Sequence, residues 1–173
     1  MKVEIRNNMM MVTTDYSSIF VSGAKRLGGR WDQRKKSWLF DAKDEVHVRN
    51  LLKRVYGTDG LDEPELVRVR LDLYGYYNDL CAKTSWIEMF GRILVDRKYS
   101  HMPPMVHDSA TVIQGGFADQ SDISAKRELE PKEGTILEIR DVPRQLAEDE
   151  ITFNPYVEII EEKINDQEEP ACE

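Results

Sequence analysis

Apolar and polar residues alternate at the start of the chain in a pattern that predicts short strands. Residues 2–6 and 10–13 flank the pair Asn7-Asn8, a common turn sequence in hairpins. Residues 30–32 and 37–40 repeat this arrangement around a polar turn. The first part of the chain is therefore expected to contain two β-hairpins.

A helical spacing follows each predicted hairpin. Asp15 is a plausible N-cap for a helix over residues 16–27 that Gly28-Gly29 ends. Asp41 caps a second helix that Gly57 ends. Apolar or small residues recur at i, i+3, i+4 and i+7 in both segments: Phe20, Gly23, Ala24 and Leu27, then Val48, Leu51, Leu52 and Val55. Residues 1–57 thus predict a compact β-β-α-β-β-α module, a size at which many domains fold alone.

The pattern changes after a polar linker over residues 58–65. Val67, Val69, Leu71 and Leu73 alternate with polar residues, which indicates a half-buried strand. Further segments predict strands at 86–95, 110–114 and 135–141, a short helix at 144–150, and a strand or first helical turn at 156–160. We expect an α+β protein in which residues 66–163 form a mainly antiparallel β domain, a barrel or a sandwich, followed by a disordered acidic tail over residues 164–173.

Charge is distributed very unevenly between these two parts. Residues 1–57 hold 12 Lys and Arg against 6 Asp and Glu, a net charge of +6, whereas residues 58–173 carry −14. The whole chain is therefore at −8, which argues against general coating of DNA but not against local binding through the basic part. No apolar run approaches the ~20 residues of a membrane span. With only two cysteines, we expect reduced thiols and a cytoplasmic location.

The predicted second hairpin combines cations with two tryptophans. The cluster predicts contacts with nucleic-acid phosphates. Trp31 or Trp38 would stack on an unpaired base, and Trp38 is the candidate that we select. The alternative for Trp31 and Trp38 is a place in the small core, since a small module needs large aromatic side chains for burial. The candidate nucleic-acid-binding residues are Lys25, Arg26, Arg30, Arg34, Lys35, Lys36 and Trp38.

The same segment carries a family resemblance. The runs Ala24-Lys25-Arg26-Leu27-Gly28-Gly29-Arg30-Trp31-Asp32 and Lys36-Ser37-Trp38-Leu39-Phe40 resemble the core of a small bacterial domain of uncharacterised function, found in plasmid primases and other DNA-processing proteins of mobile elements. They are similar, more loosely, to the HARP module of annealing helicases. Gly29 stands where the first family usually has Ala. The remainder of the chain, around Phe90-Gly91-Arg92 and residues 134–143, resembles uncharacterised phage and plasmid proteins.

These features predict a non-catalytic accessory protein of a mobile element that binds nucleic acid, single-stranded or forked, or a nucleoprotein complex. An alternative places function in the acidic part, because residues 128–173 carry a net charge of −11. Such a surface would imitate a phosphate backbone and block a basic host nuclease, as some anti-CRISPR proteins do. The candidate residues for this second role are Glu148, Asp149, Glu150, Glu161 and Glu162.

Catalytic and metal-binding patterns are weak. His101, His107 and Asp108 lie close in sequence, but their spacing fits no zinc site. The chain has no phosphate-loop or nucleophile-elbow motif. We therefore expect no cofactor, no metal and no enzymatic activity, with a metal-dependent nuclease built from scattered carboxylates as a remote alternative.

Overall fold

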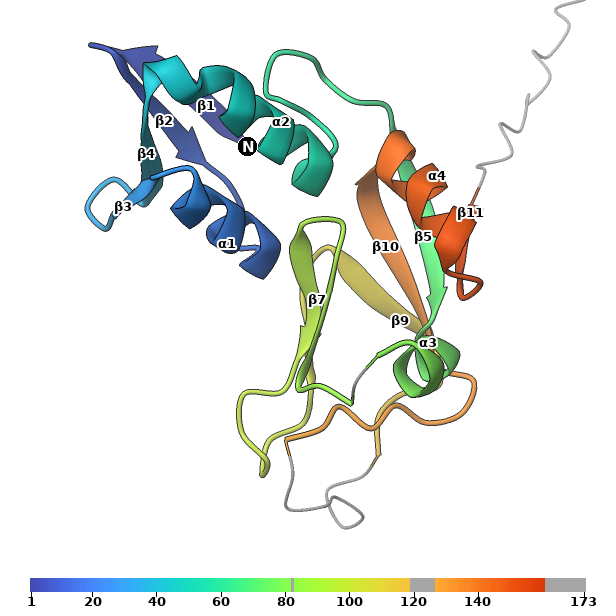
Figure 1. Ribbon diagram of the computed structural model, residues 1–173. Coiled ribbons are helices and arrows are strands. Elements are labelled where there is room, and N and C mark those ends of the chain that lie inside the picture. The colour runs from blue at the N-terminus through green and yellow to red at the C-terminus, as the bar shows by residue number, and fades with distance from the viewer. Residues whose placement is uncertain (82, 119–126, 161–173) are drawn as a thin grey trace, which may run out of the picture.

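The computed structural model describes residues 1–81, 83–118 and 127–160. Within these residues four α-helices accompany eleven strands in three antiparallel sheets (Figure 1). This architecture confirms the prediction of an α+β fold with a mainly β second part. Among the described strands no sheet closes into a barrel, so the barrel alternative for the second part is wrong.

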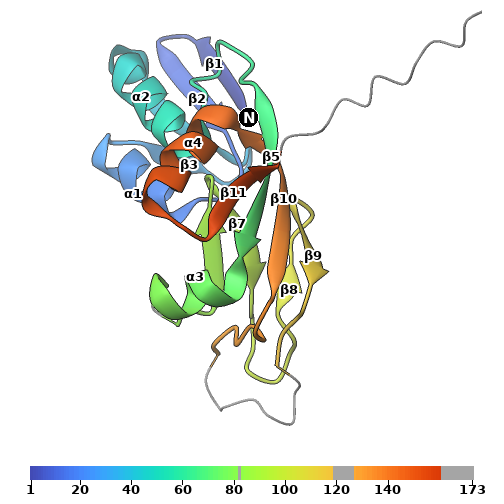
Figure 2. The same ribbon diagram turned by 90° about the vertical axis from the view of Figure 1, so that its right-hand side faces the viewer.

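The first module contains four strands and two helices in the predicted order. Its elements are β1 (Lys2–Arg6), β2 (Met9–Thr13), α1 (Ser18–Arg26), β3 (Arg30–Asp32), β4 (Ser37–Asp41) and α2 (Glu45–Tyr56). The strands form one sheet in the order β1-β2-β4-β3, and both helices lie on the same face of this sheet (Figure 2).

Strand register explains which face the helices cover. Met10 pairs with Phe40 and Val12 pairs with Trp38, and all four side chains are buried. Alternate residues of a strand point to opposite faces, so these four project together toward the helices. There they pack against Phe20 and Ala24 of α1 and the apolar stripe of α2, forming one core cluster.

The structure agrees with the predicted caps at Asp41 and Gly57 and differs at the start of α1. Asp41 caps a short 3-10 turn (Ala42–Asp44) that leads into α2, and Gly57 ends α2 in the left-handed conformation at φ 74°. The N-cap of α1 is Ser17, whose hydroxyl accepts a hydrogen bond from Phe20 N, and not Asp15 as predicted. The helix consequently begins at Ser18, two residues later than the spacing alone indicated.

The described residues of the second part form two sheets and two helices. Its elements are β5 (Leu66–Asp72), α3 (Leu73–Asp79), β6 (Trp86–Met89), β7 (Arg92–Asp96), β8 (Met105–Val106), β9 (Ala110–Gln114), β10 (Ile136–Pro143), α4 (Arg144–Phe153) and β11 (Val157–Ile160). The sheet orders are β11-β5-β10-β9 and β6-β7-β8. A separate core cluster, from Val69 to Val157, lies between these elements.

Two local predictions for this part need correction. The strand expected over residues 86–95 is a hairpin, because Phe90 and Gly91 both have positive φ and form a turn. Residues after Asp72 form helix α3, since the Asp72 carboxylate accepts a hydrogen bond from Gly75 N and caps it. For the segment 156–160, predicted as either a strand or a first helical turn, the structure shows strand β11. The predicted tail over residues 164–173 lies outside the described residues.

The two parts are docked through polar and close-packed contacts. Glu88 of β6 accepts hydrogen bonds from the Ser17 hydroxyl at 2.7 Å and from Ser18 N at 3.0 Å, so a residue of the second part caps the first helix. The turn between β6 and β7 approaches the end of α2 so closely that a Cβ on Gly91 would lie 2.6 Å from the Val55 carbonyl oxygen. The two core clusters are therefore joined by a fixed junction.

Candidate nucleic-acid interface

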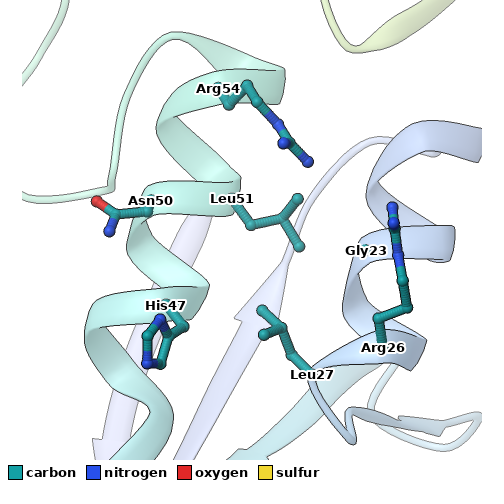
Figure 3. Close-up of a pocket in the computed structure, with 7 residues that line it drawn as sticks. All are labelled: Gly23, Arg26, Leu27, His47, Asn50, Leu51 and Arg54. Carbon is teal, nitrogen blue, oxygen red and sulfur yellow. The ribbon is translucent and has the colours of Figure 1, made fainter.

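A groove of about 360 Å³ runs between α1 and α2 on the side away from the sheet (Figure 3). Both helices contribute side chains to its walls. The lining residues are Gly23, Arg26 and Leu27 from α1 and its end, and His47, Asn50, Leu51 and Arg54 from α2.

The floor of the groove is apolar because α1 carries a glycine at the helix contact. A Cβ on Gly23 would lie 2.6 Å from Leu51 Cδ1, so the absence of a side chain lets α2 place Leu51 directly against α1. Leu27 approaches from the opposite wall (Figure 3). Both leucines also contact the core of the module, and this anchoring keeps the floor in place.

Two arginines stand above this floor, one from each helix. Arg54 reaches from α2 toward α1 (Figure 3) and makes no hydrogen bond or ion pair with any residue that the structure describes. The Nε of Arg26 donates only to Ser22 O of its own helix, at 3.4 Å. Guanidinium groups bind phosphate oxygens in a bidentate manner, so this pair is suited to an anionic ligand.

The β3–β4 hairpin carries the second group of cations. Its turn is fixed by Asp32, whose Oδ1 accepts from Arg34 N at 2.9 Å and from Lys35 N at 3.1 Å, a side-chain turn typical of aspartate. Lys36 adopts a left-handed conformation at φ 50°. Arg34, Lys35 and Lys36 are all exposed, so the hairpin presents three cations to solvent.

The two tryptophans have different environments. Trp38 is 8% exposed and packs edge-on against Phe20, with ring centroids 6.3 Å apart. Its expected role in stacking on a base is therefore corrected, because a base cannot reach a ring buried in the core. Trp31 is 52% exposed and lies against Trp38 at 5.7 Å between centroids. Trp31 is thus the tryptophan of this hairpin that a base can reach.

The structure separates the remaining predicted residues. Arg30 and Trp31 are consecutive in β3, so their side chains project from opposite faces of the sheet. Lys25 is exposed on α1 next to Arg26. The predicted basic cluster therefore divides into a groove, a hairpin tip and one arginine on the face of the sheet that carries no helix.

Sequence reasoning missed the contribution of α2 to the groove. His47, Asn50, Leu51 and Arg54 follow the spacing i, i+3, i+4 and i+7, which defines one stripe beside the core stripe. This stripe is the sequence pattern from which the groove wall on α2 could have been predicted. Leu51 is its only apolar residue, so an apolar periodicity alone does not reveal it.

Ion pairing distinguishes these cations from others in the same module. Lys2, Arg6, Lys43 and Arg49 each lie within 4 Å of a carboxylate. Within the described ranges no ion pair involves the groove arginines or the three cations of the hairpin turn. A cation that no carboxylate pairs with keeps its charge available for an external anion.

Three of the five acidic candidates, Glu148, Asp149 and Glu150, lie on α4. Glu148 and Asp149 are exposed, and Glu148 lies 3.9 Å from Arg144. The Glu150 Oε1 accepts from Asn154 Nδ2 at 2.8 Å, so this carboxylate has a local structural contact. The remaining two candidates, Glu161 and Glu162, lie outside the described residues.

Both histidines between β7 and β9 make side-chain contacts. His107 Nε2 lies 2.9 Å from Asp96 Oδ1, and the ring of His101 stacks on Tyr99. In the described part of the chain, no group of three or more His, Cys, Asp or Glu side chains is placed to hold a metal ion. No described helix is long and apolar enough to span a bilayer.

Comparison with known proteins gives no match to any protein-family model, curated protein or solved structure. The geometry of the groove and hairpin is accordingly the basis for a functional proposal.

Proposed function

We propose that this protein is a non-catalytic accessory protein that binds nucleic acid through its first module. The observation that carries the proposal is the cluster of exposed, unpaired cations: Arg26 and Arg54 over an apolar groove, and Arg34, Lys35 and Lys36 on the neighbouring hairpin. Arginine and lysine contacts with phosphates supply most of the sequence-independent affinity for nucleic acid.

The exposed ring of Trp31 supports the same function. A base stacked on an aromatic ring adds about 1–3 kcal/mol to binding. The ring of Trp31 packs against the ring of Trp38. This contact restricts the orientation of Trp31, so little side-chain freedom is lost on binding. The resemblance of residues 2–57 to a domain of mobile-element DNA-processing proteins agrees with this proposal, which also implies a cytoplasmic location.

A fluorescence titration tests the proposal. Purified protein is titrated with single-stranded DNA, double-stranded DNA and RNA at low salt, and tryptophan emission is followed. We expect quenching that is strongly reduced in Trp31→Phe. Trp38→Phe is the matched control, because it changes a buried ring of the same hairpin. An absence of binding to all three nucleic acids at low salt would contradict the proposal.

The second candidate is an inhibitor that binds a basic host nuclease through α4. The observation that favours it is Phe153, which is 84% exposed and follows Asp149 by one helical turn. Exposed aromatic side chains often anchor protein interfaces. In this case Phe153→Ala with Asp149→Asn would abolish binding to a basic partner and leave nucleic-acid binding unchanged.

A further inference from the structure

Two exposed aromatic side chains meet at the junction of the two parts. Tyr16, which precedes α1, is 62% exposed, and Trp86, at the start of β6, is 47% exposed. Both border one hollow of about 220 Å³. The other lining residues are Ser18, Ser85, Ile93, Asp96, Arg97 and Arg127.

The distance between these two aromatic residues is fixed by the junction beneath them. Glu88 lies two residues after Trp86 on the same strand and is bonded to both Ser17 and Ser18. Tyr16 directly precedes these serines. The hydrogen bonds of Glu88 with Ser17 and Ser18 therefore connect the backbone segments that carry the two rings. A ligand between the rings would meet a preformed site.

A second hollow adjoins the first. It has a volume of about 380 Å³, and Tyr16 and Ile93 line both hollows. Arg92 and His107 contribute to the second one. Tyr16 thus lies between two recesses, which gives room for a ring on one side and for connected polar groups on the other.

We propose that the hollow between Tyr16 and Trp86 takes an unpaired base of a strand bound by the first module. The inference rests on the proposed function and specifies its ligand. Aromatic rings stack on any base, and Ser85 and Asp96 supply groups that hydrogen-bond to base edges. A base within a duplex is stacked and paired, so it does not enter this hollow without being extruded.

The position of the hollow along α1 agrees with a shared strand. Ser18 begins the helix at the hollow, and Arg26 ends it at the groove. At 1.5 Å per residue these positions are about 12 Å apart along the helix axis, a span that a few nucleotides of extended strand cover. The groove would hold phosphates, and the hollow would then select strands with an unpaired base.

Oligonucleotides with a single 2-aminopurine, as a single strand and within a duplex, test this inference. We expect Trp86→Ala to weaken binding of the single strand roughly tenfold and to abolish the change in 2-aminopurine emission, while duplex binding stays unchanged. Trp86→Phe should retain most of the affinity. Tyr99→Ala is the matched control, because Tyr99 is 52% exposed and does not line the hollow.

The possible failures can be told apart. If the wild-type protein binds the single strand and Trp86→Ala binds it equally well with the same emission change, the inference is wrong and the proposed function stands. If the wild-type protein binds neither strand nor duplex at low salt, the proposed function is wrong and the inference with it. Circular dichroism and thermal unfolding of each variant verify that the folded state is retained.

Discussion

Arginine is used differently in the two parts of the molecule. After residue 57 the side chain of every described arginine forms an ion pair with a carboxylate or donates to a carbonyl oxygen: Arg68, Arg70, Arg92, Arg97, Arg127, Arg140 and Arg144. In the first module, Arg30, Arg34 and Arg54 make no such contact with any described residue.

This difference separates cations that hold the fold from cations that remain available. Arg97 is an example of the first kind, because it is 1% exposed and its guanidinium joins Met102 O and Glu128 O. Arg54 is an example of the second kind, exposed above a groove. The net charge of the chain, −8, does not reveal this difference, because a sum of charges does not show which charged side chains are already paired.

The largest expected effect is on binding by the groove arginines. Replacing Arg26→Ser together with Arg54→Ser removes two charge-assisted contacts, each worth roughly 1.5–3 kcal/mol. We expect affinity for single-stranded DNA to fall at least about a hundredfold, as measured by fluorescence anisotropy.

The matched control is Arg68→Ser together with Arg70→Ser. It removes the same charge from arginines that pair with Glu138 and Glu158. Equal losses of affinity in the two double variants would show that net charge, not the groove, determines binding.

The buried arginine provides the reverse test. Arg97→Ala leaves two carbonyl groups without their donor and opens a cavity in the second part. We expect the free energy of unfolding to fall by about 2–3 kcal/mol. Affinity for duplex DNA, which does not use the hollow that Arg97 borders, should stay unchanged under conditions where the variant is folded. Denaturant unfolding measures the first quantity. A variant as stable as the wild type would refute the structural role of Arg97.

A smaller effect is expected at the junction between the parts. Gly91 has φ 75°, and a Cβ there would meet Val55 O, so Gly91→Ala should cost about 2 kcal/mol of stability. Gly28 has nearly the same φ, 74°, but no atom lies within 4 Å of its Cβ position. Gly28→Ala should therefore cost only about 1 kcal/mol. If thermal unfolding shows equal costs, the close packing at the junction does not contribute to stability.

The smallest expected effect on stability is a pH dependence caused by Tyr56, the last residue of α2, and it occurs only at alkaline pH. Burial raises the pKa of Tyr56 from 10.0 to about 12. Between these values the unfolded chain loses the phenol proton while the folded protein keeps it, so the stabilisation present below pH 10 is lost as pH rises. We expect unfolding free energy to decline over this range, and less steeply in Tyr56→Phe. Parallel pH profiles for the two proteins would contradict this.

Local patterns predicted much of the fold. The alternation through β5, the two helical stripes and the Gly57 cap all depend on residues close in sequence, and the structure agrees with them. The N-cap of α1 is Ser17 and not Asp15, and the Ser17 hydroxyl also donates to Glu88, which lies 71 residues later. No local pattern reports such a contact.

The site was predicted only in part for the same reason. The hairpin cations are adjacent in sequence and were identified, whereas the groove depends on the packing of α1 against α2. Arg26 and Arg54 are 28 positions apart and meet only because Gly23 allows a close helix contact. The burial of Trp38 likewise depends on Phe20 and on strand pairing with Val12, which a motif does not reveal.

The salt dependence of binding to a single-stranded oligonucleotide tests the central claim most directly. Each phosphate contacted by a cation contributes about −0.7 to the slope of log affinity against log salt concentration for a single strand. With three or more unpaired cations engaged, we predict a slope of about −2 or steeper, reduced by roughly 1.4 in the Arg26→Ser/Arg54→Ser variant. A slope near zero, or one unchanged in that variant, would contradict the assignment of the groove as the nucleic-acid interface.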